Sequence, residues 1–327
     1  MASWRYTFGS IKKIFVSNKA YRCVICGNFG SPASQIVELI DRRKGLPGSW
    51  QLVECNHCHV IALEPIPSEE ELATYYAAYS DDENVDLSIK MGSRRPWLRK
   101  VFHRLTGDVD PRDFVQVRTG ERVLDYGCGH AGYLSDFHHR GIAISGAEIA
   151  GYVVQACQKR GFDVRQVERF SHIPFGDNEF DVVYLMQVFE HLREPHVFMQ
   201  ELSRVLKSGG TLYLAVPNIN SVWRKVFGKN WVSGWFAPFH LFHYSRVSLA
   251  NLAAQHGFDL EDSWSNTPES WFRLNLKAWI HPAENRLDWR ASWLDARPVR
   301  YISMLLLRVI EIPVRERDCL VVKLIKR

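Results

Sequence analysis

Alternation of short β-branched segments with helical segments constrains the fold of this chain more than any other feature. Five strand-like runs occupy residues 122–126, 143–148, 162–167, 181–186 and 211–216. Helical patterns fill 133–140, 153–160 and 196–206, and we expect the last of these helices to end at the glycine pair 209–210. Strands that alternate with helices form a parallel sheet covered by helices. The chain is therefore expected to contain an α/β domain.

A glycine-rich sequence follows the first of these strands directly. Gly127, Gly129 and Gly132 form a G-x-G-x-x-G pattern between a strand and a helix, and Glu148 ends the next strand. Glycines there permit a tight turn and a close approach of a ligand to the backbone, while the acid can accept hydrogen bonds from ribose hydroxyls. This combination predicts an adenosine-bearing cofactor. The alternative is a glycine-rich turn with no ligand and a surface Glu148.

Four further segments resemble those of class I S-adenosylmethionine-dependent methyltransferases. Together with the glycine loop they follow one another in the family's order over residues 121–218. Their sequences are PFGDNEFDVVY at 174–184, EHL at 190–192, ELSRVLKSGGTL at 201–212 and VPN at 216–218. The resemblance implies a Rossmann-like, seven-stranded, mostly parallel sheet whose last strand is antiparallel. The strand-like runs 258–263 and 318–323 are the candidates for the end of that sheet.

The resemblance also assigns residues to S-adenosylmethionine. In the family the glycine loop holds the methionine part, the acid after the second strand holds the ribose, and the segment before the fourth strand flanks the adenine. The cofactor-binding residues that it implies here are Asp125, Gly127, Gly129, Glu148, Glu168, Phe170 and Gln187. The family's small residue and Asp before the adenine segment are replaced here by the sequence VERF at 167–170.

Two CxxC pairs precede the α/β part. Cys23 with Cys26 and Cys55 with Cys58 can each curl around one face of a tetrahedral ion, and four thiolates would complete the ligand sphere of a structural zinc ion. Iron, a redox dithiol pair, or a histidine at 57 or 59 in place of one cysteine are the alternatives. We expect a zinc-ribbon module at 18–66 and a helical connector at 67–112 before the Rossmann-like methyltransferase domain at 113–327. A four-cysteine ribbon before such a domain resembles a group of sugar- and glycan-modifying methyltransferases.

The reaction edge should lie beyond the carboxyl ends of the parallel strands. Gln187, Glu190 and His191 follow the fourth strand, and Asn218 follows the fifth. Imidazole titrates near neutral pH, so His191 and His240 are the candidate catalytic bases. The alternative is that these histidines are structural and that EHL only orients the loop.

Aromatic residues are concentrated at 219–247. They suggest a lid over a ring-shaped or apolar acceptor, since aromatic faces bury a large area at low entropic cost. Core packing is one alternative. Another is peripheral membrane contact, because the same segment carries Arg224, Lys225 and Lys229.

Composition excludes several other classes of protein. The net charge of +5 is too small to indicate nucleic-acid binding. The beginning has no uninterrupted apolar stretch, and the most apolar later segment, 301–314, is too short to span a bilayer, so we expect a cytoplasmic protein. The expected activity is methyl transfer to an oxygen or carbon of a small-molecule, sugar or glycan acceptor. A non-catalytic zinc-ribbon adaptor and an NAD-dependent oxidoreductase remain as alternatives, and the oligomeric state is left open.

Overall fold

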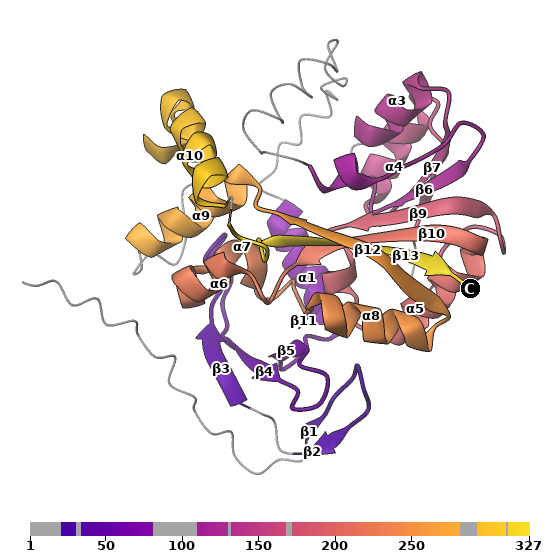
Figure 1. Cartoon of the computed structure of the whole chain (residues 1–327). Helices are drawn as coiled ribbons and strands as arrows, with labels where there is room; N and C mark the ends of the chain where they lie inside the picture. The colour runs from indigo at the N-terminus through magenta and orange to yellow at the C-terminus, as the bar shows by residue number, and fades with distance from the viewer. Residues whose placement is uncertain are drawn as a thin grey trace, which may run out of the picture.

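The computed structural model describes residues 21–30, 34–80, 110–129, 132–167, 172–281, 293–311 and 313–327. Its centre is a seven-stranded sheet in the order β12-β13-β10-β9-β6-β7-β8 (Figure 1). The strands are β6 (Arg122–Tyr126), β7 (Ala143–Glu148), β8 (Val164–Gln166), β9 (Phe180–Met186), β10 (Leu206–Pro217), β12 (Phe258–Asn266) and β13 (Cys319–Lys326). Only β13 runs antiparallel to its neighbours, β10 and β12. The predicted fold class, a mostly parallel sheet with an antiparallel last strand, is confirmed.

Helices cover both faces of this sheet. Helix α3 (Gly132–His139) lies above the sheet in Figure 1, and α5 (Pro195–Val205) and α8 (Arg246–Gln255) lie below it. Helix α4 (Gly151–Gln158) packs on β7 and β8. Helix α5 buries Phe198, Met199, Leu202 and Val205, whose spacing of three to four residues forms one apolar stripe.

The helix predicted at 196–206 ends earlier than its glycine pair. Leu206 already pairs with Phe180 of β9, and the register then shifts before Thr211. A Cβ on Gly210 would lie 2.8 Å from the carbonyl oxygen of Lys207. The two glycines therefore allow an irregularity inside β10 instead of terminating the helix.

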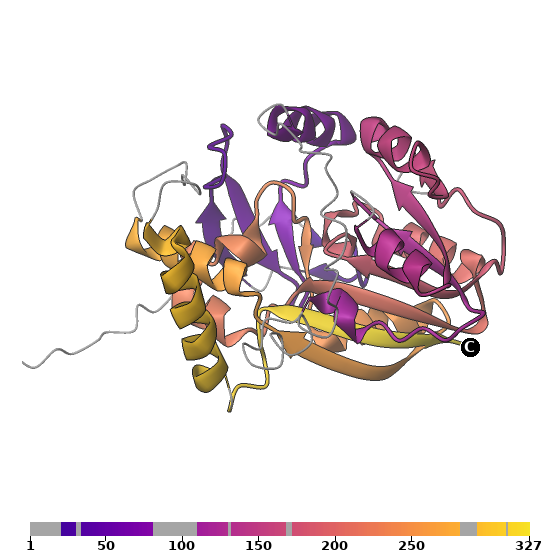
Figure 2. The ribbon, with the colours of Figure 1, turned by 90° about the horizontal axis from the view of Figure 1, so that it is seen from above.

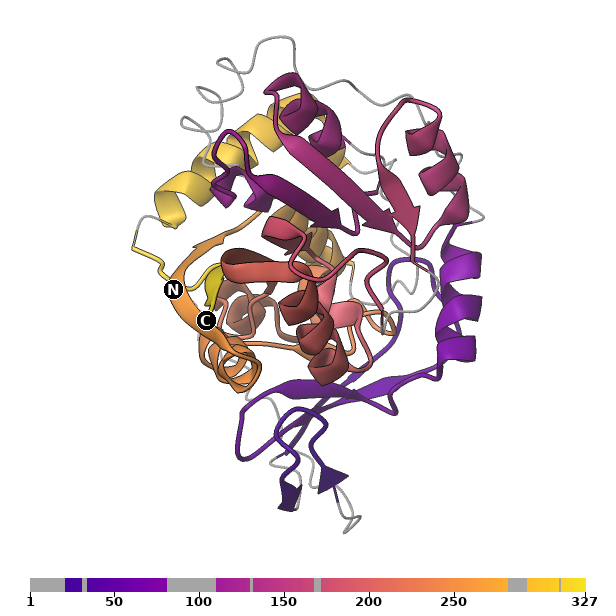
Figure 3. The same cartoon turned by 90° about the vertical axis from the view of Figure 1, so that its right-hand side faces the viewer.

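The amino-terminal residues form two small sheets. One pairs β1 (Tyr21–Arg22) with β2 (Phe29–Gly30), and the other has the order β11-β5-β4-β3. The latter combines β3 (Ser34–Leu39), β4 (Trp50–Glu54) and β5 (Ile61–Glu64) with β11 (Phe242–His243). A strand from the carboxyl half of the chain thus completes the sheet, and one hydrophobic cluster runs from Cys23 to Leu324. Figure 3 shows this smaller sheet below the central one.

Helix α1 (Glu69–Ser80) connects the two sheets. The Ser68 hydroxyl accepts a hydrogen bond from the Glu71 amide at 3.1 Å, and the Glu71 carboxylate accepts one from the Ser68 amide at 2.7 Å. This reciprocal pair caps the start of the helix, as the Ser-x-x-Glu spacing predicts. The 3-10 helix η1 (Pro111–Phe114) leads into β6. Residues 81–109 of the predicted helical connector lie outside the described residues.

The segment predicted as an aromatic lid is folded into the core. It forms α6 (Val222–Phe227), the 3-10 helix η3 (Gly228–Asn230), α7 (Val232–Trp235) and β11. The buried rings are Trp223, Phe227, Trp231, Trp235, Phe239, Phe242 and Tyr244, and Phe236 is partly exposed. Trp223 and Phe227 pack on Phe272 of α9 (Glu269–Ile280), and Tyr244 packs on Phe189. The expectation of a lid over an acceptor is therefore corrected to core packing for all but Phe236, and the alternative of membrane contact through these aromatics is corrected for the same reason.

The remaining helices lie at the end of the sheet where β9 and β10 finish. They are α9 (Glu269–Ile280), the 3-10 helix η4 (Trp293–Asp295) and α10 (Arg297–Ile310) (Figures 1 and 2). Helix α9 packs on α6, α7 and α10. No helix in the described part of the chain is long and apolar enough to cross a membrane.

Candidate functional site

The glycine loop makes a sharp turn directly after β6. The amides of Gly127 and Cys128 both donate to the Ala147 carbonyl, at 2.8 and 3.2 Å. Gly127 has a φ of +79°, and a Cβ there would lie 2.5 Å from the Val188 side chain. Gly129 has a φ of +51°, yet a Cβ on it would meet nothing within 4 Å. At position 127 the contact with Val188 therefore leaves no room for a side chain. At position 129, by contrast, the space in front of the backbone is open.

Glu148 is held against this loop. Its Oε2 accepts a hydrogen bond from the Gly129 amide at 2.9 Å, and its Oε1 accepts from the amides of Ile149 and Ala150 at 2.8 and 3.2 Å. The structure thus brings together the glycine loop and the acid that the sequence pairs with it. Beside them Ile149 and Tyr152 expose apolar surface, a feature that the sequence pattern did not single out.

Asp125 lies at the end of β6, beneath the loop. Its side chain is 1% exposed, and neither carboxylate oxygen has a hydrogen-bond partner among the described residues. Burial raises the pKa of Asp125 to about 6, and the Arg112 guanidinium opposes that rise. A buried carboxylate is costly unless donors are close to it. Arg112 and the Tyr184 hydroxyl stabilise the charged form of Asp125. Its remaining acceptor capacity and the open space at Gly129 fit a ligand with a cationic or donor group.

A second cluster, Glu190, His191 and His240, lies beyond the carboxyl end of β9. Glu190 and His191 belong to the 3-10 helix η2 (Phe189–His191), and His240 precedes β11. One ligand atom from each of the three lies within 4.8 Å of the other two. The two imidazole rings are nearly perpendicular, with centroids 4.7 Å apart. Nδ1 of His240 lies 2.7 Å from the Gly234 carbonyl oxygen, and its Nε2 lies 3.8 Å from Glu190 Oε1. The structure brings both predicted bases together.

Burial keeps the members of this cluster uncharged near neutral pH. It raises the pKa of Glu190 to about 8, and neither of its carboxylate oxygens has a hydrogen-bond partner among the described residues. Burial also lowers the pKa of His191 to about 4, with a contribution from Arg43, and the pKa of His240 falls well below its ordinary value. Both imidazoles are therefore neutral and each has one ring nitrogen able to accept a proton.

Tyr76 of α1 joins this cluster and was missed by the sequence reasoning. Its hydroxyl lies 3.0 Å from His191 Nδ1, and its ring packs on Phe239 with centroids 4.9 Å apart. Partial desolvation, then the nearby carboxylates of Glu190 and Glu148, raises the pKa of Tyr76 above its ordinary value, although the residue keeps 38% of its surface exposed. Tyr76 consequently lies within electrostatic range of both the glycine-loop acid and the histidine cluster. No local pattern in α1 distinguishes this tyrosine from its neighbours.

Gln187 and Asn218 have different surroundings although both end strands. Gln187 has a φ of +60°, donates to Cys319 Sγ at 3.3 Å, and has an Oε1 with no partner among the described residues. Asn218 is fully buried and donates to Glu316 at 2.9 Å, so it braces the start of β13 and does not line the reaction edge. Glu168 and Phe170, predicted to contact the cofactor, lie outside the described residues.

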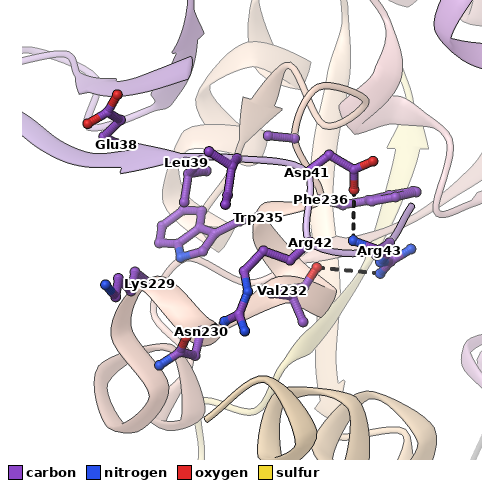
Figure 4. Close-up of a pocket in the computed structure, with 12 residues that line it drawn as sticks. Glu38, Leu39, Asp41, Arg42, Arg43, Lys229, Asn230, Val232, Trp235 and Phe236 are labelled. Atoms are coloured by element: carbon purple, nitrogen blue, oxygen red, sulfur yellow. Dashed lines mark hydrogen bonds between the residues drawn. The ribbon is translucent and has the colours of Figure 1, made fainter. Parts of the chain in front are cut away.

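A cavity of about 180 Å³ lies between residues 38–43 and 229–237 (Figure 4). The Arg43 guanidinium lies 3.5 Å from the centre of the Phe236 ring, which forms part of the wall. The Phe236 ring centre is 5.1 Å from that of His240 and 6.4 Å from that of His191. A ligand in this cavity would therefore be separated from the histidines by one aromatic ring.

The two CxxC turns are built alike and face each other. The Gly27 amide donates to the Cys23 carbonyl at 2.9 Å, and the His59 amide donates to the Cys55 carbonyl at 3.0 Å. Cys23 Sγ lies 3.6 Å from Cys58 Sγ, and Cys26 Sγ lies 3.6 Å from Cys55 Sγ. A tetrahedral zinc ion with Zn–S bonds of about 2.3 Å places its sulfurs about 3.8 Å apart. The four thiols fit such an ion.

The histidines near these turns are not part of the cluster. His59 pairs with Glu54 at 3.2 Å and its side chain is largely exposed. Among the described residues, the group with metal-ligand spacing at this end of the chain consists of the four cysteines alone. His196 of α5 approaches the Ile25 carbonyl within 2.7 Å, which links the first turn to the larger sheet.

Comparison with known proteins finds methyltransferases among the sequences similar to this chain. A probable S-adenosylmethionine-dependent methyltransferase of Mycolicibacterium smegmatis is 31% identical over 173 residues, which are 51% of this chain and 61% of that protein. A ubiquinone biosynthesis O-methyltransferase of Maricaulis maris is 30% identical over 38% of this chain and 52% of that protein. The chain thus spans less than two thirds of the length of these relatives.

The solved structure of a SAM-dependent methyltransferase from Archaeoglobus fulgidus superposes with a TM-score of 0.43 at 16% identity. The match covers 77% of this chain and 100% of that one. Residues 97–263, about half of the sequence, match the family described as the methyltransferase domain. The chain belongs to this methyltransferase-domain family.

Proposed function

We propose that the protein transfers the methyl group of S-adenosylmethionine to an oxygen or carbon of a small-molecule, sugar or glycan acceptor. One observation carries this proposal: the glycine loop and the histidine cluster meet at the same edge of the sheet. Gly127 packs directly on Val188, which precedes η2, and Tyr76 is influenced by both Glu148 and Glu190. A donor held by the loop would thus lie beside groups that can accept a proton.

The cofactor residues follow from the polar groups around the loop. When bound, S-adenosylmethionine supplies a methyl group already activated on a sulfonium sulfur. Asp125 would pair with the ammonium of its methionine part, Glu148 would accept hydrogen bonds from its ribose, and the backbone at Gly127 and Gly129 would lie against it. We further propose Glu168 and Phe170 beside the adenine, and Gln187 beside the methionine part.

The histidine cluster would handle the acceptor's proton. A neutral His191 or His240 can take the proton that an acceptor hydroxyl or carbon acid releases as it attacks the methyl carbon. Tyr76 would fix the His191 ring through its hydroxyl. Protonated Glu190 keeps the pocket free of negative charge, which favours neutral imidazoles.

The relatives support the acceptor class in general terms. The Maricaulis protein's name places it in ubiquinone biosynthesis, which is small-molecule chemistry. We propose the same broad class here. The division into a zinc-ribbon module at 18–66, a connector at 67–112 and a methyltransferase domain at 113–327 likewise remains our proposal, with the four cysteines holding one structural zinc ion.

Calorimetric titration with S-adenosylmethionine tests the proposal, using wild type and Glu148→Ala, with NAD as the control ligand. We expect micromolar binding of S-adenosylmethionine, weakened at least about tenfold by the substitution, and no binding of NAD. Binding followed by methyl transfer in an acceptor screen would distinguish the enzyme from a non-catalytic adaptor. Preference for NAD, or the absence of S-adenosylmethionine binding, would overturn the proposal.

A further inference from the structure

Helix α10 presents an extensive apolar surface to solvent. Six of its side chains have exposed fractions between 50% and 66%: Tyr301, Ile302, Leu305, Leu306, Val309 and Ile310. At 100° per residue these six positions fall on one side of the helix. Trp293, in the adjoining η4, is 65% exposed. Single exposed apolar residues are ordinary, but a contiguous face of this kind marks an interaction surface.

The opposite side of α10 packs on the body of the protein and so holds the apolar face toward solvent. Met304 and Leu307 are buried against the body of the protein. The Ser303 hydroxyl donates to Glu269 of α9 at 2.7 Å, and Glu311, directly after the helix, accepts a hydrogen bond from Trp223 Nε1 at 2.6 Å. Helix α10 is thus anchored by one face, and the other face points outward (Figure 2).

The charges on α10 indicate what this face meets. Its sequence, RPVRYISMLLLRVI, contains three arginines and no acidic residue. Arg308 is exposed and lies two turns from Tyr301, so it borders the apolar face. Arg300 lies on the anchored side of the helix, where its Nε is 3.9 Å from the Glu269 carboxylate. A basic residue bordering an apolar face, with the aromatic side chains of Tyr301 and Trp293 nearby, is typical of helices that lie in the interface of an anionic bilayer.

Self-association fits these charges less well. In a two-fold dimer the same surface meets itself. Neither α10 would then offer a carboxylate to Arg308 of the other. A surface of anionic lipid headgroups complements both the apolar face and Arg308.

We propose that α10 docks the protein onto a lipid bilayer containing anionic headgroups, with its axis in the plane of the membrane. Leu305, Leu306 and Val309 would enter the boundary between headgroups and acyl chains, and Arg308 would contact lipid phosphates. This docking does not depend on the proposed methyl transfer, because none of the residues on the apolar face lines the glycine loop or the histidine cluster.

Co-sedimentation with vesicles tests this docking. Wild type is expected to sediment with mixed phosphatidylglycerol and phosphatidylcholine vesicles, weakly with phosphatidylcholine alone, and less as salt rises. The double variant Leu305→Gln/Val309→Gln should bind at least about tenfold more weakly. Val226→Gln/Val247→Gln, which changes exposed valines on α6 and α8, should bind like wild type.

Two further measurements keep the test decisive. Hydrogen exchange should slow on vesicle addition at 301–310, and Arg308→Glu should weaken binding without unfolding the helix. Wild type that fails to bind anionic vesicles, or equal binding by the Leu305→Gln/Val309→Gln variant, would refute the docking. A dimer dissociated by that variant, in the absence of vesicle binding, would assign the face to a second copy and also overturn the proposal.

Discussion

The Tyr76 hydroxyl lies 3.0 Å from Nδ1 of His191, although the two residues are 115 positions apart in the chain. Tyr76 comes from the helix that follows the cysteine turns, whereas His191 follows a strand of the central sheet. The amino-terminal part of the chain therefore contributes directly to the candidate reaction centre.

Removing that hydroxyl should impair methyl transfer and leave cofactor affinity intact. Tyr76→Phe keeps the ring contact with Phe239 but frees His191 to rotate. We expect kcat to fall by about tenfold, which corresponds to a lost hydrogen bond of about 1.4 kcal/mol, with an unchanged dissociation constant for S-adenosylmethionine. Tyr75→Phe is the matched control, since Tyr75 packs on Trp50. Equal activity of the two variants would show that the contact has no catalytic role.

The open space at Gly129 predicts a selective effect on cofactor binding. Gly129→Ala places a methyl group in front of the loop and strains a backbone with φ of +51°. Gly161→Ala is the control, because its φ is +85° and a Cβ there also meets nothing within 4 Å. Both variants should lose about 1 kcal/mol of stability. Calorimetry should show that only Gly129→Ala loses S-adenosylmethionine affinity, by at least about tenfold; the same loss in both would locate the cofactor elsewhere.

The four-cysteine cluster predicts one zinc ion per chain. Cys58→Ser should abolish bound zinc, measured by elemental analysis of the purified protein, and lower the melting temperature strongly because metal binding contributes directly to folding free energy. Cys157→Ser changes a buried cysteine outside the cluster and should retain the metal. Zinc content that does not differ between the two variants would contradict this assignment.

Burial of Glu190 predicts a dependence of stability on pH. An ordinary Glu has a pKa of 4.5, and that of folded Glu190 is about 8. Between these values the unfolded chain releases the proton while the folded protein keeps it, so stability falls as pH rises through this window. Each pKa unit corresponds to about 1.4 kcal/mol, and a loss of a few kcal/mol is expected.

Glu190→Gln should lack this contribution. Urea unfolding of both proteins at about pH 5 and about pH 8 measures the difference, and the variant should gain stability relative to wild type at the higher pH. The other buried acids, Asp125 and Asp318, titrate in both proteins and cancel in the comparison. If the stability difference between wild type and Glu190→Gln were the same at both pH values, Glu190 would not take up a proton on folding.

The sequence predicts the parts of this protein whose signals are local. Strands such as β9 are buried on both faces and appear as continuous apolar runs, and the glycine loop, Glu148 and the CxxC pairs have spacings imposed by the backbone geometry they form. Because His191 follows a parallel strand directly in the sequence, its position at the carboxyl end of that strand could also be predicted.

Contacts between distant segments could not be predicted in this way. Tyr76 reaches His191 through tertiary packing, and β11 is only two residues long, too short for any periodic signal. The aromatic residues at 219–247 were assigned to a lid because their composition is the same for a lid and for a core. What decides between the two is tertiary packing, such as that of Trp223 and Phe227 on Phe272 of α9.

The pairing of β11 with β5 limits how this chain can be divided. Phe242 pairs with Ala62 and His243 with Ile61. A fragment cut after residue 66 would leave the outer backbone groups of β5 open to solvent and prone to pairing with other chains. The complementary fragment would expose the rings of Phe242 and Tyr244. The cysteine turns and the segment around His240 are therefore expected to fold together, as one cooperative unit.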